Sequence, residues 1–466
     1  MGNNTQQKDY AVMIDYARTP FTKASAVPTK AGTLQEILPK EKYEDLKRTL
    51  LVDKGLNATE VHALLTMPFI TPKSTKDNKV GVMAHVDPLD MAAKIVGDTV
   101  ERTLIAHGID TSEVKGVYFG CVHQEGPQGL NIARNVVLHP GSKLPQSVPG
   151  VSVDMFCASS GEAISICKDK IENSNGSVNL LIAGGTQSMS QIMMGGNNSY
   201  INPHIYDGNA KAFMNMGVTA ENLVKLYGIS RREQEEFALR SHLRTVAARE
   251  KGYFDGGEII PVVDGVNEDD CVRADVSLEK MATLKPVFRD PREGGTITPA
   301  TSSPTTDGAS VAILASESYA RKNNLPILGR IISVASVGCA PEIMGIGPVE
   351  AGNEALRKAG LSMNQMAKIE INEAFCGQVL SCLKEWRKQG TPVDMDKLNV
   401  DGGATAVGHP LAASFTRLAG HAMRILQRTG ERYALVGACI GGGQGEAMVV
   451  ENPNYTIDAP APAPRL

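Results

Sequence analysis

Apolar residues along this chain fall into short runs typical of strands, and these runs alternate with segments of helical spacing. Apolar positions at Met91, Ile95, Val100 and Leu104 predict a helix that ends at Gly108. Strands are expected at residues 10–16, 116–122, 179–183, 310–315 and 433–438, and further helices at 131–138 and 231–249. This alternation predicts an α/β layered fold with largely parallel strands.

The same order of elements occurs twice. Residues 102–121 align without a gap with residues 354–373, which places Gly108 on Gly360 at the end of a helix. Farther along, the segment that contains His409 takes the place of the segment that contains Cys157. The repeat predicts two pseudo-symmetric halves whose equivalent strand ends face one site.

The repeat also defines the expected domains. The ranges are 1–190 for the first part of the N-terminal half, 191–300 for an inserted loop domain, 301–320 for the last strand of that half, 321–453 for the C-terminal half and 454–466 for a flexible Pro/Ala-rich tail. A further insertion at about 28–87 is helical and charged at 38–51. It is either an oligomer contact or a solvated helical hairpin, and the sequence leaves both open.

Composition narrows the classes of partner and compartment. The net charge is −4, with both signs interspersed, so neither nucleic acid nor an anionic membrane is an expected partner. No apolar run reaches the ~20 residues of a membrane-spanning helix, and the N-terminus is polar. We therefore expect a cytoplasmic protein without membrane insertion. The C-terminal Pro464-Arg-Leu466 only loosely resembles a peroxisomal Ser-Lys-Leu signal, so a peroxisomal location is not expected.

Eight cysteines are scattered along the chain without a Cys-x-x-Cys pair, which predicts reduced thiols and no metal site. Cys157 follows an apolar stretch expected to be a buried strand, and a helix follows it at Ala163, Ile164 and Cys167. Free N–H groups and the dipole at that helix start would lower the pKa of the thiol and activate it as a nucleophile. The alternative is a small buried residue, because free cysteine is among the most buried residue types.

Ten short motifs, in a fixed order over residues 10–452, together resemble the thiolase family of acyl-CoA acyltransferases. They include Arg18-Thr-Pro-Phe21, Cys157-Ala-Ser-Ser-Gly161, Met216-Gly-Val-Thr-Ala-Glu-Asn222, Asn372-Glu-Ala-Phe375, Gly402-Gly-Ala-Thr-Ala-Val-Gly-His-Pro410 and Cys439-Ile-Gly-Gly-Gly-Gln-Gly445. The resemblance implies a thiolase-like duplicated αβαβα layered fold of two pseudo-symmetric halves with an inserted loop domain. In the family that loop domain covers coenzyme A (CoA).

The resemblance also implies catalytic roles. Cys157 would attack the 3-keto carbon of an acyl-CoA and carry the acyl group, while His409 accepts the thiol proton. Cys439 would shuttle the proton at C2 of the acetyl unit. Asn372 would hold a water that forms one oxyanion hole with His409, and the N–H groups of Cys157 and Gly441 would form the other.

Further expectations concern ligands and assembly. Ser303, Met216, Met344 and Phe375 match family positions that bind the pantetheine and acyl parts of the substrate. CoA enters as a substrate, and neither another cofactor nor a metal is expected. The family also implies a homodimer or homotetramer, and docking to a β-oxidation partner is an open alternative.

Some residues depart from the family pattern. Asn215 stands where a histidine is usual, and Ala412 and Phe415 stand where glycines are frequent. Phe415 either crowds the acyl tunnel or packs behind its helix, and chain-length preference and reaction direction stay open. Two rivals remain: a ketosynthase-type condensing enzyme, against which Cys439 argues, and a catalytically silent scaffold that docks another CoA enzyme.

Overall fold

A mixed sheet of ten strands dominates the described part of the chain in the computed structural model, which covers residues 9–25, 29–33, 40–54, 58, 61, 68–72, 81–197 and 200–460. The strand order is β10-β11-β12-β9-β1-β8-β7-β5-β6, and β2 pairs with β8. The strands of the first half are β1 (Ala11–Arg18), β2 (Thr22–Lys23), β5 (Val117–Gly120), β6 (Gly150–Val153), β7 (Leu180–Ser188) and β8 (Thr306–Ser316). Those of the second half are β9 (Gly329–Gly338), β10 (Lys368–Ile371), β11 (Tyr433–Ile440) and β12 (Gln444–Glu451).

The expectation of largely parallel strands is wrong. Parallel pairing occurs between β5 and β6, β5 and β7, and β10 and β11. The strands β1, β8, β9 and β12 pair with their neighbours in antiparallel fashion. The cause is local: β11 turns back into β12 through Gly441 to Gly443, and β8 returns beside β7 after the excursion at 191–300.

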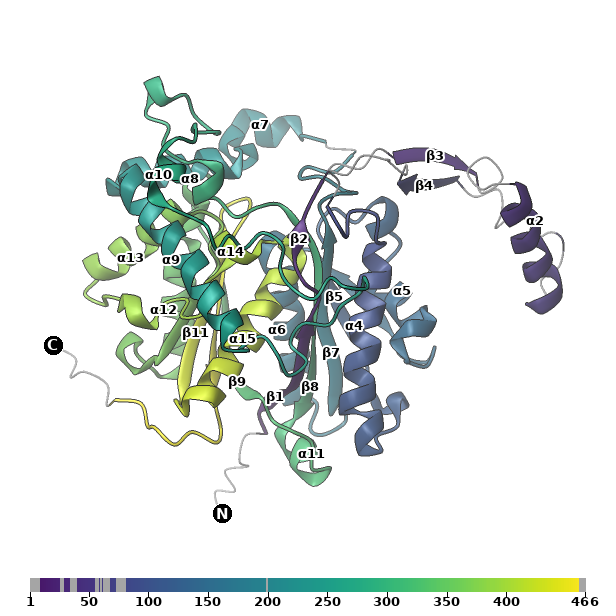
Figure 1. The fold of residues 1–466 in the computed structure, drawn as a ribbon. Coiled ribbons are helices and arrows are strands. Elements are labelled where there is room, and N and C mark those ends of the chain that lie inside the picture. Colours follow the sequence, from purple (N-terminus) through teal and green to yellow (C-terminus); the bar gives the residue numbers. More distant parts are fainter. Residues whose placement is uncertain are drawn as a thin grey trace, which may run out of the picture.

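Helices cover the two half-sheets in three layers, as Figure 1 shows. Val311 and Ile313 of β8 pack in one apolar cluster with Ile95 and Val96 of an outer helix. The alternate residues Ala312 and Leu314 face the opposite side. The outer helices of the first half are α4 (Pro88–Thr103) and α5 (Ile132–Leu138), those of the second half are α12 (Gly347–Ala359) and α13 (Cys376–Lys388), and α6 (Ser159–Glu172) and α15 (Ser414–Thr429) lie between the half-sheets. The predicted αβαβα layering is confirmed.

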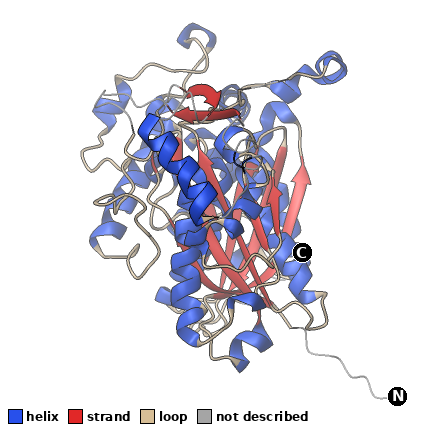
Figure 2. Cartoon of the chain, turned by 90° about the vertical axis from the view of Figure 1, so that its right-hand side faces the viewer, coloured by secondary structure: helices blue, strands red, loops and turns tan. Residues whose placement is uncertain are grey.

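The central pair of helices is buried by both half-sheets. Ile164 of α6 and Leu418 of α15 share an apolar cluster with Leu314 from the first half-sheet and Met448 from the second. Strands are red and helices blue in Figure 2, where the sheet runs through the body behind the helices. One core therefore joins the two halves, because each supplies one wall of it.

Backbone geometry supports the sequence repeat. Gly108 (φ 73°) and Gly360 (φ 67°) both take the left-handed conformation that ends the preceding helix. The pair β5/β6 has a reduced counterpart in a single parallel bridge between Ile369 and Leu398. The two halves thus share one plan, and the second lacks a full edge strand among its described residues.

The excursion at 191–300 carries the helices α7 (Pro203–Asn209), α8 (Met216–Tyr227), α9 (Arg231–Glu250) and α10 (Leu278–Ala282). It is tied to β1 by Arg18, whose side chain is fully buried and donates to both carboxylate oxygens of Asp269 at 2.6 and 2.9 Å. Glu258 accepts a backbone hydrogen bond from Arg18 and also contacts His421 of α15 at 3.1 Å. This buried ionic network fixes the excursion to both halves.

The insertion leaves the body after β2 and returns before α4. It contains an antiparallel pair, β3 (Thr29–Thr33) and β4 (Pro68–Pro72), and the helix α2 (Lys40–Arg48), which extend away from the sheet in Figure 1. The predicted helix at 38–51 is confirmed in α2, which buries no side chain. Gly81 N–H donates to Ser25 Oγ at 2.9 Å, so the two ends of the insertion meet. Residues 26–28, 34–39, 55–57, 59–60, 62–67 and 73–80 and the C-terminal residues 461–466, including Pro464-Arg-Leu466, lie outside the described residues.

Phe415 packs behind its helix, which decides between the two expectations for this residue. Its side chain is fully buried in the central layer, and a Cβ at Gly161 of α6 would lie 2.6 Å from its ring. Any side chain at position 161 would therefore collide with Phe415.

Phe415→Ala should lower the free energy of unfolding by about 3–5 kcal/mol, because it leaves a cavity between α6 and α15. Urea unfolding followed by circular dichroism measures the effect. The matched control is Leu226→Ala, at a position that is 62% exposed, which should change the midpoint little. Equal midpoints for the two variants would contradict the packing described here.

Candidate functional site

Cys157 lies at the start of α6, in a sharp turn after β6. Phe156 takes a left-handed backbone conformation (φ 45°), and the thiol that follows is 7% exposed. β6 is an edge strand with Val151 45% exposed, so the expectation of a buried strand is wrong although the strand-to-helix order holds.

The pKa of Cys157 is raised to about 12, which corrects the expected activation by the helix start. Burial is the main cause, and the hydrogen bonds from the N–H groups of Gly441 and of Cys157 itself lower the pKa by less. At rest the sulfur is therefore a protonated thiol that needs a base.

The segment that follows His409 packs against this thiol. Leu411 and Ala412, which follow the histidine, pack against Cys157 in one apolar cluster. The imidazole is 5% exposed, with Nε2 3.2 Å from Asn372 Nδ2 and Nδ1 2.5 Å from Ser414 Oγ. The structure thus pairs His409 with Asn372, and it packs the segment after His409 against Cys157.

The hydrogen bonds fix the protonation of the imidazole ring. The Ser414 hydroxyl donates to the carbonyl oxygen of Pro410 at 2.9 Å, so its oxygen accepts from His409 Nδ1–H. Nε2 then carries the lone pair. Burial, and next the positive charge of Arg417, lower the pKa of His409 to about 3, which keeps the ring neutral and able to accept a proton.

Cys439 lies near the C-terminal end of β11, one residue before its last residue, and is fully buried. Burial raises its pKa well above the ordinary value, and the nearby Cys157 raises it further. The glycine turn after it brings backbone close to the first cysteine: a Cβ at Gly441 would lie 3.5 Å from the Phe156 ring and 3.6 Å from Met216 Sδ. The two cysteines therefore lie near each other.

Asn372 follows β10 directly and is fully buried. Its backbone N–H donates to Gly437 O at 2.8 Å, which holds it against β11. Its side-chain oxygen has no hydrogen-bond partner among the described residues, so it is free to accept one more hydrogen bond beside His409.

The four expected substrate residues lie around Cys439 and Asn372. Met344 and Phe375 share an apolar cluster with Cys439, and Met216 packs against it. Ser303 donates its backbone N–H to Ala374 O at 3.0 Å, which puts it next to the Asn372 strand end. Asn215, at the position usual for a histidine, caps α8 by accepting from Gly217 N–H at 2.9 Å.

Sequence reasoning missed two residues that shape the site. Ser414 orients the imidazole, and the signal was its place five residues after His409, close to the helix start. Glu373 lies inside a quoted motif, but its hydrogen-bond partners lie 26, 32 and 132 positions away, which spacing does not report.

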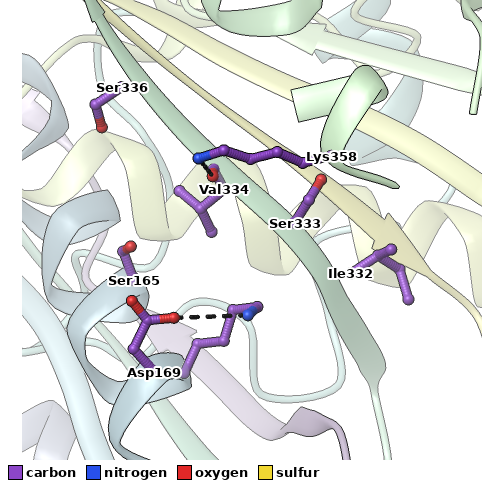
Figure 3. Close-up of a pocket in the computed structure, with 8 residues that line it drawn as sticks. Ser165, Asp169, Ile332, Ser333, Val334, Ser336 and Lys358 are labelled. Carbon is purple, nitrogen blue, oxygen red and sulfur yellow. Dashed lines mark hydrogen bonds and ion pairs between the residues drawn. The ribbon is translucent and has the colours of Figure 1, made fainter. Parts of the chain in front are cut away.

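Other features of the described residues lie apart from this site. A cavity of about 370 Å³ opens between α6 and β9, lined by Ser165, Lys168, Asp169, Ser336 and Lys358 among others (Figure 3). None of the expected site residues lines it. Within the described ranges, no cluster of three or more His, Cys, Asp and Glu side chains forms a metal-binding group, and no helix there has the length and apolar character to cross a membrane. All eight cysteines are free.

Comparison with known proteins gives the family. The model for the N-terminal domain of thiolase matches residues 71–318, and that for the C-terminal domain of thiolase matches residues 325–452. A 3-ketoacyl-CoA thiolase of Aliivibrio fischeri is 39% identical over 387 residues, covering 81% of this chain and 96% of that protein. A 3-ketoacyl-CoA thiolase of Klebsiella pneumoniae is 40% identical over 383 residues, covering 80% and 95%.

Two solved structures are also similar to this chain. An acetyl-CoA acetyltransferase of Bacillus anthracis has a TM-score of 0.73 at 28% identity and covers 96% of this chain and 100% of its own. Human mitochondrial 3-ketoacyl-CoA thiolase has a TM-score of 0.73 at 29% identity and covers 96% and 99%. These matches do not favour the ketosynthase alternative. The chain belongs to the thiolase family and is an acyltransferase of that family.

Proposed function

We propose that this protein cleaves 3-ketoacyl-CoA with CoA, through an acyl group carried on Cys157. The observations that support this proposal most directly are two neighbouring buried thiols, and a neutral imidazole in contact with a buried amide. A reaction between two thioesters needs one sulfur to carry the acyl group and a separate acid and base for the neighbouring carbon.

The proton transfers balance within the site. His409 Nε2 takes the Cys157 thiol proton as the sulfur attacks C3 of the substrate. The C2–C3 bond then breaks, and Cys439 protonates C2 of the departing acetyl-CoA. The CoA thiol next gives its proton to Cys439 and attacks the acyl carbon, the bond from that carbon to the Cys157 sulfur breaks, and the sulfur regains its proton from His409, which leaves a shortened acyl-CoA. The reverse sequence is a Claisen condensation.

Two oxyanion holes are proposed. The N–H groups of Cys157 and Gly441 both point at the Cys157 sulfur, where the acyl oxygen would develop negative charge. In the other, His409 Nε2 would donate once it carries the Cys157 proton, together with a water held by Asn372, whose side-chain oxygen has a free acceptor position among the described contacts.

The excursion at 191–300 is proposed to cover CoA. Its helix α8 starts at Met216, which contacts the Cys439 glycine turn, so this segment borders the reacting groups. Ser303, Met344 and Phe375 are proposed to contact the pantetheine and acyl parts. The domain limits 1–190, 191–300, 301–320, 321–453 and 454–466 are part of this proposal.

Setting and assembly follow the family. We propose that CoA and acyl-CoA are substrates, that no further cofactor or metal takes part, and that the protein works in the cytoplasm as a homodimer or homotetramer. The eight free cysteines support a reducing compartment. The exposed helix α2 supports a docking role for the insertion, with a β-oxidation enzyme as the proposed partner.

Replacing each cysteine separately tests the division of labour. Cys157→Ser should lower kcat by about 10³-fold or more, with no acyl adduct in the intact mass. Cys439→Ser should still form the adduct on Cys157 but lose deuterium exchange at C2 of acetyl-CoA by about 10²–10⁴-fold. Normal turnover in either variant would overturn the two-cysteine assignment.

The pH profile tests the neutral imidazole. Because the pKa of His409 is lowered to about 3, His409 stays available as a base, and acylation of Cys157 should not fall as the pH drops from about 8 to about 5. Arg417→Met removes one cause of the low pKa, so the acid limb should move to higher pH. Rapid quench with intact-mass detection measures the rate, and a wild-type rate that halves near pH 6.5 would contradict the argument.

Substrate length is tested by CoA-dependent cleavage of 3-ketoacyl-CoA from four to sixteen carbons, followed by loss of the enolate absorbance. Turnover with an adduct on Cys157 at six or more carbons is expected if this chain acts as the named 3-ketoacyl-CoA thiolases do. Turnover of acetoacetyl-CoA alone would indicate two-carbon metabolism. Failure at every length would favour the scaffold alternative.

A further inference from the structure

The Glu373 carboxylate sits directly after Asn372 and is 1% exposed. It accepts three hydrogen bonds: from Asn399 Nδ2 at 2.8 Å, from Ser241 Oγ at 2.6 Å and from Thr405 N–H at 3.0 Å. A buried carboxylate with three donors is held rigidly, because a charged acceptor makes stronger hydrogen bonds than a neutral one.

The first donor fixes the strand end that carries Asn372. Asn399 has a left-handed backbone (φ 44°) and pairs by its side chain with both backbone groups of Ile371, each at 2.9 Å. Its side-chain amide therefore pairs with β10 as a residue of a neighbouring strand would, and Glu373 holds that amide in place.

The hydrogen bond from Thr405 N–H fixes the turn that leads to His409. Thr405 lies in the short helix α14 (Ala404–Val407), four residues before the imidazole. A Cβ at Gly403 would lie 2.4 Å from Glu373 Cδ, so the turn packs directly on the carboxylate. The Asn372 to His409 contact at 3.2 Å closes a ring of contacts that passes through Glu373.

The remaining donor, Ser241, comes from outside both halves. Ser241 lies on α9, within the excursion at 191–300, and its hydroxyl oxygen also accepts from Gly403 N–H at 3.1 Å. Arg244 of α9 donates to Leu398 O at 2.6 Å, and Arg240 contacts the same oxygen. The helix is thus fastened along the whole segment from Leu398 to Gly403.

We propose that Glu373 and Ser241 are positioning residues, through which α9 sets the geometry between His409 and Asn372. The excursion at 191–300 then has a second task besides covering CoA: it braces the groups that move protons. The proposal rests on the roles proposed above for His409 and Asn372.

Ser241→Ala tests the brace. The change leaves Glu373 with two donors and leaves Gly403 N–H without its acceptor, so the turn before His409 should shift. We expect kcat to fall about ten- to a hundredfold, the range that a displacement of ~1 Å produces, with KM for CoA unchanged. Adduct formation on Cys157 and deuterium exchange at C2 should slow together, because His409 and Asn372 serve both. Ser241→Cys, which keeps a weak donor of similar size, should recover part of the rate.

The matched control is Ser381→Ala. Ser381 is also fully buried on a helix, but its hydroxyl donates only to Gly377 O of its own helix at 2.7 Å. Ser241→Ala should lower the melting temperature at least as much as Ser381→Ala, since it leaves a buried N–H without an acceptor, and only Ser241→Ala should lose rate at temperatures where both variants are folded. Equal rates in the two variants would overturn the brace, as would a fall confined to KM. His409→Asn separates the two proposals: if it stays fully active, the proposed function of the site fails instead.

Discussion

Burial of the reacting groups is the constraint on which the rest of the site depends. Cys157, Cys439 and His409 are each at most 7% exposed, and burial disfavours the charged form of all three. Both cysteines are therefore neutral thiols at rest and the imidazole is a neutral base. Charge that forms during the reaction must be stabilised by a hydrogen-bond donor or acceptor already in place, because water is excluded from the buried groups. That requirement explains the closely packed glycine turn after Cys439 and the imidazole held at both nitrogens.

Duplication of one fold plan supplies those fixed partners. Each half brings a strand end with a reactive residue, and the central helices α6 and α15 are shared by both half-sheets, so the two ends cannot drift apart without opening the common core. The excursion adds a third support, tied to β1 through Arg18 and to α15 through His421. The site is assembled from three parts of the chain, which are distant in sequence and joined by buried contacts.

The resemblance to the thiolase family singled out Cys157, His409, Asn372 and Cys439, and local patterns predicted the alternation of strands and helices and most helix limits. They failed where the answer depends on long-range pairing or on a balance of energies. Strand direction was wrong because periodicity does not report how a neighbour runs, and β6 was taken as buried although it lies at the sheet edge. The pKa of Cys157 was expected to fall because the helix start is visible in sequence, whereas the larger cost of burial is not.

The meeting of Ser25 with Gly81 has a consequence for how this chain tolerates change in length. A segment whose two ends already touch adds little closure entropy to the body, since that cost grows only with the logarithm of its length. The alignment with the Aliivibrio fischeri relative takes in 96% of that protein but 81% of this chain, so this chain has residues that the alignment leaves out. A segment inserted at this junction can therefore change in length or sequence at little cost to the stability of the catalytic body.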